Sequence, residues 1–189
     1  MSKYSVVSYL DPESTIRIRE LQHKLFELTG SRACLDHWLP HITVGDGLIL
    51  KDKNLTLMEQ SLSSLVAAKQ PFKVRLQSFG GTNNWVPGKG DHATNYVLWI
   101  NVPVHHDLHT LIDDIRQISK DQEVWYEMPT PYVPHVTIAF HDLSTEGYEK
   151  GRVYLGDVTI DVWCTIDHVA LVEKLVGQDK QYQRYNFAD

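Results

Sequence analysis

The chain has 189 residues, of which 42% are hydrophobic and 10% aromatic, so it can bury one substantial core or two small lobes that share one. Its formal net charge of −6 argues against an extended surface for duplex nucleic acid, although a local basic groove or a small phosphorylated ligand stays compatible. No segment approaches the roughly 18 apolar residues that span a bilayer, and the N-terminus lacks a cleavage-site pattern. We therefore expect a soluble, cytoplasmic protein without a membrane partner.

The two cysteines, Cys34 and Cys164, are too few for a disulfide framework and lack the spacing of a zinc site. We expect both to be reduced structural thiols.

The first part of the chain alternates strands and helices. Residues 3–10 are rich in Val and Tyr and predict a strand. Asp11 suits a helix N-cap and Pro12 the first helical position, and apolar residues then recur at three- and four-residue steps until Gly30 ends the pattern. After the strand at residues 41–44, we expect Asn54 to cap a second amphipathic helix.

The middle of the chain contains one regular and one irregular stretch. Residues 72–79 alternate apolar with polar side chains, as a half-exposed strand does. Residues 80–95 consist mostly of turn formers and include Trp85, so they predict a loop or a lobe junction.

The second part repeats the order of the first. Residues 96–102 predict a strand and residues 108–118 an amphipathic helix, and a weaker helix is expected near residues 144–153. Further strands are expected at residues 158–164, 168–176 and 182–187. Because the order strand, helix, strand, helix, strand occurs twice, we infer an internal duplication within one domain of residues 1–189, with lobes at roughly 1–90 and 91–189.

One six-residue pattern occurs in both parts, as Leu-Pro-His-Ile-Thr-Val at residues 39–44 and Val-Pro-His-Val-Thr-Ile at residues 133–138. In a strand, side chains at i and i+2 project from one face, so His41 lies beside Thr43 and His135 beside Thr137. A single His-x-Thr is usually structural, whereas two copies at the same point of a repeated pattern indicate a site.

The residue types in these motifs suit proton transfer. The ordinary pKa of histidine is about 6.5, so one imidazole of a pair can be neutral and act as a base while the other is protonated and acts as an acid. The threonine hydroxyls can donate to phosphate oxygens as charge develops in the transition state. This chemistry requires no metal or cofactor. A metal cluster of His105, His106 and His109 is the alternative, but a solvated helix turn explains these residues better.

The two motifs resemble those of the 2H phosphoesterase superfamily, which includes 2′,5′ RNA ligase-like proteins and cyclic phosphodiesterases. The resemblance covers nearly the whole chain. It implies a bilobed α+β fold with an antiparallel sheet and helices in each lobe, a pseudo-two-fold axis and a central cleft, with strands open to exchange between the lobes. It also implies that His41, Thr43, His135 and Thr137 are the catalytic residues.

The expected function is a metal-independent phosphodiesterase acting on 2′,3′-cyclic phosphates or 2′,5′-linked nucleotides. The alternatives are a 2′,5′ RNA ligase or RNA 3′-end nuclease, and a non-catalytic nucleotide-binding module. Bacterial 2′,5′ RNA ligase-like proteins usually carry Arg five residues after the second motif histidine, where this chain has Phe140, and this favours hydrolysis. We expect a monomer whose partner is a nucleotide or an RNA end.

Aromatic side chains are the sequence-tolerant way to bind a base, and Phe140 and Trp85 are the candidates. Strict alternation places Phe140 on the face opposite His135, so a buried core Phe is the competing interpretation.

Overall fold

The computed structural model describes residues 2–85, 95–129, 131–175 and 178–188. Strands and helices alternate along most of these residues. The helices are α1 (Pro12–Thr29), α2 (Ala33–His37), α3 (Asp52–Ala67), α4 (His106–Asp121) and α5 (Thr145–Gly156). The strands are β1 (Ser2–Tyr9), β2 (His41–Leu50), β3 (Phe72–Gln77), β4 (Phe79–Thr82), β5 (Val97–Asn101), β6 (His135–Ala139), β7 (Asp161–Ile166), β8 (His168–Leu175) and β9 (Gln178–Asn186).

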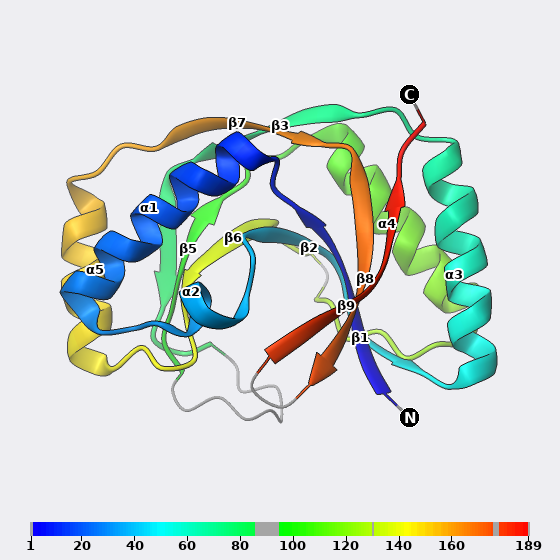
Figure 1. Ribbon diagram of the computed structural model, residues 1–189, viewed down its shortest axis with the longest axis horizontal. Helices are drawn as coiled ribbons and strands as arrows, with labels where there is room; N and C mark the ends of the chain where they lie inside the picture. The colour runs from blue at the N-terminus through cyan, green and yellow to red at the C-terminus, as the bar shows by residue number, and fades with distance from the viewer. Residues whose placement is uncertain (1, 86–94, 130, 176–177, 189) are drawn as a thin grey trace.

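The described strands form antiparallel sheets in the orders β2-β1-β8-β9, β3-β7 and β4-β5-β6. Figure 1 shows α1 and α5 together on one side of the molecule and α3 and α4 on the other. Helix α1 packs against α5 and β6, whereas α4 packs against β2. The chain therefore crosses the molecule between β1 and α1, and each side is built from both ends of the sequence. The expected α+β architecture of antiparallel sheets and helices is confirmed.

Helix α1 begins and ends where the sequence predicts. The Asp11 carboxylate accepts hydrogen bonds from the backbone N–H groups of Ser14 and Thr165, both at 2.8 Å, and Pro12 is the first helical residue. Gly30 follows the helix in the left-handed region with φ 78°, and its N–H donates to the Phe26 carbonyl. Asp11 thus ties the start of α1 to β7.

The structure differs from the predicted elements at several places, and the strands expected at residues 158–164 and 182–187 span Asp161–Ile166 and Gln178–Asn186 instead. Helix α3 begins at Asp52 after Lys51, so Asn54 lies in its first turn and does not cap it. The short helix α2 has no strong periodic signal, so its residues do not predict it. The strand expected at residues 72–79 breaks at Ser78, which has φ 62°, and the chain continues as β4.

This break decides which sheet each segment joins. Strand β3 pairs with β7 before Ser78, and β4 pairs with β5 after it. Gly80 and Gly81 lie opposite Trp99 and Leu98, so residues expected to begin a loop are part of a strand. Of the remaining expected loop positions, 83–85 and 95 belong to no helix or strand, and 86–94 lie outside the described residues. The composition of residues 80–82 could not predict this strand, because it forms by pairing with β5, which lies elsewhere in the sequence.

One hydrophobic cluster runs through the molecule, with fully buried side chains from both the first and second parts of the chain. Cys34 and Cys164 are free and buried, and burial raises the pKa of each thiol to about 12, so both are inert at neutral pH. Among the described residues, no helix is long and apolar enough to cross a membrane.

Candidate active site

In each motif the histidine is the first residue of a strand. His41 is the first residue of β2 and His135 the first of β6, and the two strands contact one another near the middle of the molecule (Figure 1). In both motifs the His and Thr side chains are half-buried while the aliphatic residues between and after them are buried. We call the face of β2 and β6 that carries His41, Thr43, His135 and Thr137 the motif face.

Each motif imidazole is oriented by the backbone just before it. The His41 Nδ1 atom donates to the Leu39 carbonyl at 2.8 Å, and the His135 Nδ1 atom donates to the Val133 carbonyl at 3.0 Å. A carbonyl only accepts, so the hydrogen lies on Nδ1 in both rings and Nε2 carries the lone pair whenever the ring is neutral. Both histidines are therefore held in the tautomer in which Nε2 is the basic nitrogen.

Both motif strands carry a β-bulge at the same position. In the β1–β2 pair, Val7 lies opposite Thr43 and Val6 opposite Gly45, so Val44 is an extra residue. In the β5–β6 pair, Trp99 lies opposite Thr137 and Leu98 opposite Ala139, so Ile138 is extra. The extra residue is the third after the motif histidine in each copy. A bulge shifts the alternation of side chains by one position.

The bulges decide where the fifth residue after each histidine points. Ala139 is buried opposite the buried Leu98, so Phe140 returns to the motif face and is half-buried. Asp46, at the equivalent position of the first motif, accepts a hydrogen bond from the Ser5 hydroxyl of β1. The expectation from strict alternation, that Phe140 lies beneath the strand, is wrong because it omits the bulge.

Aromatic rings surround His135. Trp85, Trp99 and Tyr132 lie with ring centroids 5.7, 5.6 and 5.9 Å from the imidazole. Burial among these rings lowers the pKa of His135 below its ordinary value of 6.5, and the hydrogen bond to the Val133 carbonyl opposes this in part. His135 is consequently neutral at pH 7 and available as a base.

Trp99 is placed by a close packing contact and two hydrogen bonds. A Cβ atom on Gly80 would lie 2.4 Å from Trp99 Nε1, so only glycine leaves room for the ring. Trp99 Nε1 donates to the Asn101 side-chain carbonyl at 2.8 Å, and the Asn101 amide donates to the Ser78 hydroxyl at 3.0 Å. Hydrogen bonds therefore connect Ser78, where the chain passes from one sheet to the other, with Trp99, one of the rings around His135.

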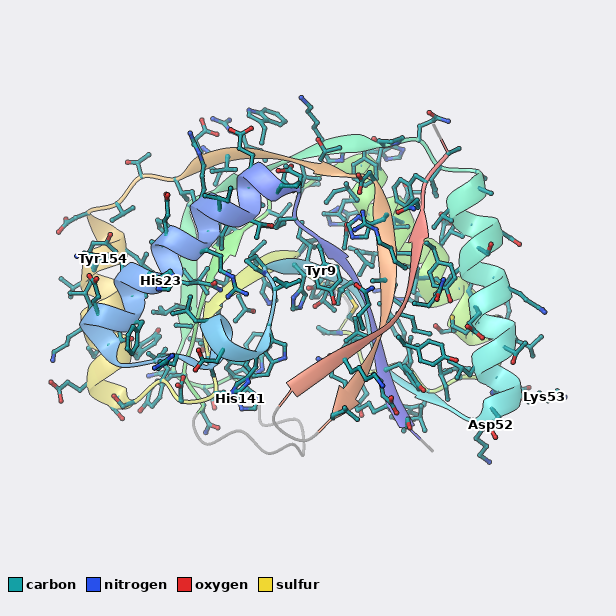
Figure 2. All side chains as sticks on the ribbon, viewed as in Figure 1. Tyr9, His23, Asp52, Lys53, His141 and Tyr154 are labelled. Atoms are coloured by element: carbon teal, nitrogen blue, oxygen red, sulfur yellow. The ribbon has the colours of Figure 1, made fainter. Side chains whose placement is uncertain are left out.

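The surroundings of His41 are different. The Tyr9 ring lies edge-on to His41 at 6.1 Å and is stacked on His168 at the same distance, near the middle of the molecule (Figure 2). His168 is buried, its Nε2 atom accepts from the Tyr9 N–H at 3.3 Å, and its Nδ1 atom donates to Asp167 at 2.6 Å. Burial lowers the pKa of His168, so it is a neutral support for Tyr9.

The remaining candidates are placed apart from the motif face. His105 stacks on Phe72 at 5.4 Å, and His109 Nδ1 donates to the His105 carbonyl at 2.9 Å. Within residues 2–85, 95–129, 131–175 and 178–188, no group of three His, Cys, Asp or Glu side chains is arranged to hold a metal ion. The helix-start histidines thus have structural contacts instead of a shared ligand position.

The predicted His41, Thr43, His135 and Thr137 lie on two strands that contact one another, and the rings of Trp85 and Phe140 lie 6.1 Å apart between centroids. The sequence did not predict that Tyr9, Trp99, Tyr132 and His168 belong to the surroundings of the motif histidines. The motif spacing does point to Asp46, which is the fifth residue after His41 as Phe140 is the fifth after His135. The others come from neighbouring strands and connections and carry no local signal.

Comparisons with known proteins agree with this geometry. A profile of the 2′-5′ RNA ligase superfamily matches residues 10–178. Among solved structures, TT0787 of Thermus thermophilus is similar with a TM-score of 0.70 at 16% identity, covering 98% of this chain and 97% of that one. LigT of E. coli complexed with 3′-AMP is similar with a TM-score of 0.67 at 14% identity, covering 100% and 99%. The MHV ns2 PDE domain has a TM-score of 0.59 at 13% identity, covering 93% and 100%. No curated protein sequence matches the chain.

Proposed function

The chain belongs to the 2′-5′ RNA ligase superfamily, and from that membership and its motif face we propose that it is a metal-independent phosphodiesterase that hydrolyses 2′,3′-cyclic phosphates or 2′,5′-linked nucleotides. The observation that carries the proposal is the matched orientation of His41 and His135, each of which donates its Nδ1–H to the backbone carbonyl two residues before it. A pair of oriented imidazoles supplies both proton transfers of one displacement.

In the proposed reaction, water attacks phosphorus and the bond from phosphorus to one ribose oxygen breaks. His135 Nε2 accepts the proton of the attacking water, since burial keeps this ring neutral. His41 Nε2–H gives its proton to the departing ribose oxygen. The hydroxyls of Thr43 and Thr137, two residues along the same face, donate to the non-bridging oxygens as their charge develops.

Nucleotide binding is supported by the rings beside His135 and by likeness to LigT, whose structure contains 3′-AMP. Trp85 and Phe140 are proposed to hold the base of the nucleotide that reacts. Phe140 occupies the position where the bacterial 2′,5′ RNA ligase-like proteins carry Arg, so this surface favours an apolar base over additional phosphates. We therefore place hydrolysis ahead of RNA ligation.

The test is turnover of a panel of nucleoside 2′,3′-cyclic phosphates and 2′,5′-linked dinucleotides in the presence of EDTA. The wild type should turn over at least one of these substrates. His41→Ala and His135→Ala should each lose about 10²–10⁴-fold in kcat while circular dichroism stays unchanged. His23→Ala, an exposed histidine on α1, is the matched control and should behave as the wild type.

Each alternative gives a different result. If one motif variant keeps near-normal kcat, the paired acid and base are wrong. If chelation stops turnover and a divalent ion restores it, metal independence is wrong. Joining of RNA ends without hydrolysis would identify a ligase, and nucleotide binding with no turnover of any substrate would identify a binding module.

A further inference from the structure

Aromatic rings form an unbroken series of contacts that begins beside His135. Trp85 contacts Phe140 at 6.1 Å between ring centroids, and Phe140 contacts His141 at 4.8 Å. His141 is stacked on Trp38 at 5.0 Å, with an angle of 28° between the ring planes. We call Trp85, Phe140, His141 and Trp38 the aromatic row. It joins the second motif to the segment that follows α2.

At the end of the row that includes His141, the backbone is strained and is held by hydrogen bonds. His141 has φ 73°, a left-handed conformation that a non-glycine residue adopts at a cost. The next residue, Asp142, accepts hydrogen bonds from the Ser31 hydroxyl at 2.6 Å and from the Arg32 and Ala33 backbone N–H groups at 2.7 and 3.1 Å. These bonds tie the end of β6 to the start of α2 and so set His141 against Trp38.

The outer rings are not core residues. Trp38, Phe140 and His141 are each half-buried, and the neighbouring His37 is exposed, so part of each ring surface reaches solvent. Figure 2 shows His141 at the edge of the molecule, away from Tyr9 at the middle. Large rings that are only half-covered and lie in a series are typical of surfaces that stack successive unpaired bases.

From this arrangement we propose that Trp38 and His141 form a second base-stacking site, which receives the nucleoside adjacent to the reactive one. The substrate class is therefore a single-stranded RNA of two or more nucleotides whose reactive phosphodiester lies between His41 and His135. A duplex is excluded from this site because paired bases have no free face to stack. The inference rests on the proposed function and adds a site for the neighbouring nucleoside of the substrate.

The experiment compares kcat/KM for a nucleoside 2′,3′-cyclic phosphate with kcat/KM for a trinucleotide that ends in the same cyclic phosphate. A second nucleoside 2′,3′-cyclic phosphate with a different base, and the trinucleotide that ends in it, provide a second matched pair. The wild type should prefer the longer member of the pair. Trp38→Ala should reduce this preference by about 5- to 150-fold, since a stacked base contributes roughly 1–3 kcal/mol.

Three further variants separate stacking from folding. Trp38→Phe retains a ring and should keep most of the preference. His141→Asn removes the ring but tolerates the left-handed backbone, and it should reduce the preference as Trp38→Ala does. Trp163→Ala is the matched control, because this Trp is 59% exposed and lies on β7, in a sheet that contains neither motif strand; it should leave the preference unchanged.

The outcomes distinguish the two proposals. A wild type that turns over substrates but does not prefer the longer member overturns the second site, as does an unchanged preference in both Trp38→Ala and His141→Asn. An equal loss of preference in Trp163→Ala also overturns it. A wild type that turns over no member of either pair overturns the proposed function, and the second site with it.

Discussion

Two histidines make the stability of the protein sensitive to acid. The pKa values of His135 and His168 lie below 6.5, chiefly because burial disfavours their charged forms. Between 6.5 and these lowered values the unfolded chain binds more protons than the folded one, so the free energy of unfolding decreases as the pH falls. Above about pH 7 the two rings are neutral in both states and contribute no slope.

We expect that these two histidines do not change the midpoint of urea unfolding above about pH 7 and that they lower it as the pH falls below about 6.5. His168→Gln keeps a donor for Asp167 and an acceptor for the Tyr9 N–H but does not titrate, so its decline should be shallower than that of the wild type. Identical profiles for the two proteins would show that His168 is not responsible.

Activity should depend on pH in the same range. If His135 is the base, kcat/KM should decrease as the pH falls below 6.5, because protonation removes the base.

Phe140 also gives a prediction at the residue scale. Because the ring is half-buried on the motif face beside Trp85, Phe140→Ala should raise KM for a nucleoside cyclic phosphate by about 5- to 150-fold. The loss of stability should be smaller than the roughly 3–5 kcal/mol that removal of a fully buried Phe costs. Phe140→Tyr retains the ring and should remain close to the wild type. An unchanged KM with a large drop in melting temperature would instead indicate a core role.

At the scale of elements, the bulges of β2 and β6 depend on small residues that follow them. Gly45 comes directly after the extra residue Val44, and a Cβ atom there would lie 2.9 Å from Ile115 Cγ2 of α4. In the second motif the equivalent Ala139 fits opposite Leu98. The two bulges are thus alike in position, and each is followed by a small residue.

We expect Gly45→Ala to destabilise the protein by about 1–3 kcal/mol, because an added methyl group overpacks the contact between β2 and α4. Gly156→Ala, at the end of α5, has nothing within 4 Å of the new Cβ atom and should be neutral or slightly stabilising. Urea denaturation of both variants measures the difference. Equal stabilities would mean that α4 moves aside without cost.

At the scale of the whole molecule, elements from the first and last parts of the chain are interleaved within the same layers. Strand β1 pairs with β8, β3 pairs with β7, and α1 packs on α5, so the ends of the chain complete one another's layers. A large hydrophobic cluster with members from both halves of the chain links these layers. The internal duplication that we infer from the sequence therefore concerns the order of elements, and the two halves need not be separate folding units.

From this interleaving we predict that fragments 1–90 and 91–189, produced separately, lack cooperative unfolding. Each fragment would expose sheet edges and apolar helix faces that its counterpart covers. The intact chain should unfold in one urea transition when followed by circular dichroism and by tryptophan fluorescence. A fragment with its own cooperative transition and dispersed amide resonances would contradict this.

The sequence by itself determined the features that follow from local chemistry. Asp11, Pro12 and Gly30 set the bounds of α1 through capping and backbone preference, and the His-x-Thr spacing placed each imidazole beside its hydroxyl. Those patterns depend only on neighbours in the chain.

Tertiary structure decided what depends on a partner strand. The extra residues Val44 and Ile138 exist only as a mismatch with β1 and β5, and they turn Phe140 and Asp46 towards the motif face against the local alternation. The rings around His135 converge from three separate segments, and the change of sheet at Ser78 requires β5 as well as β7. Register and convergence are properties of pairs of segments, so no single stretch of sequence contains them.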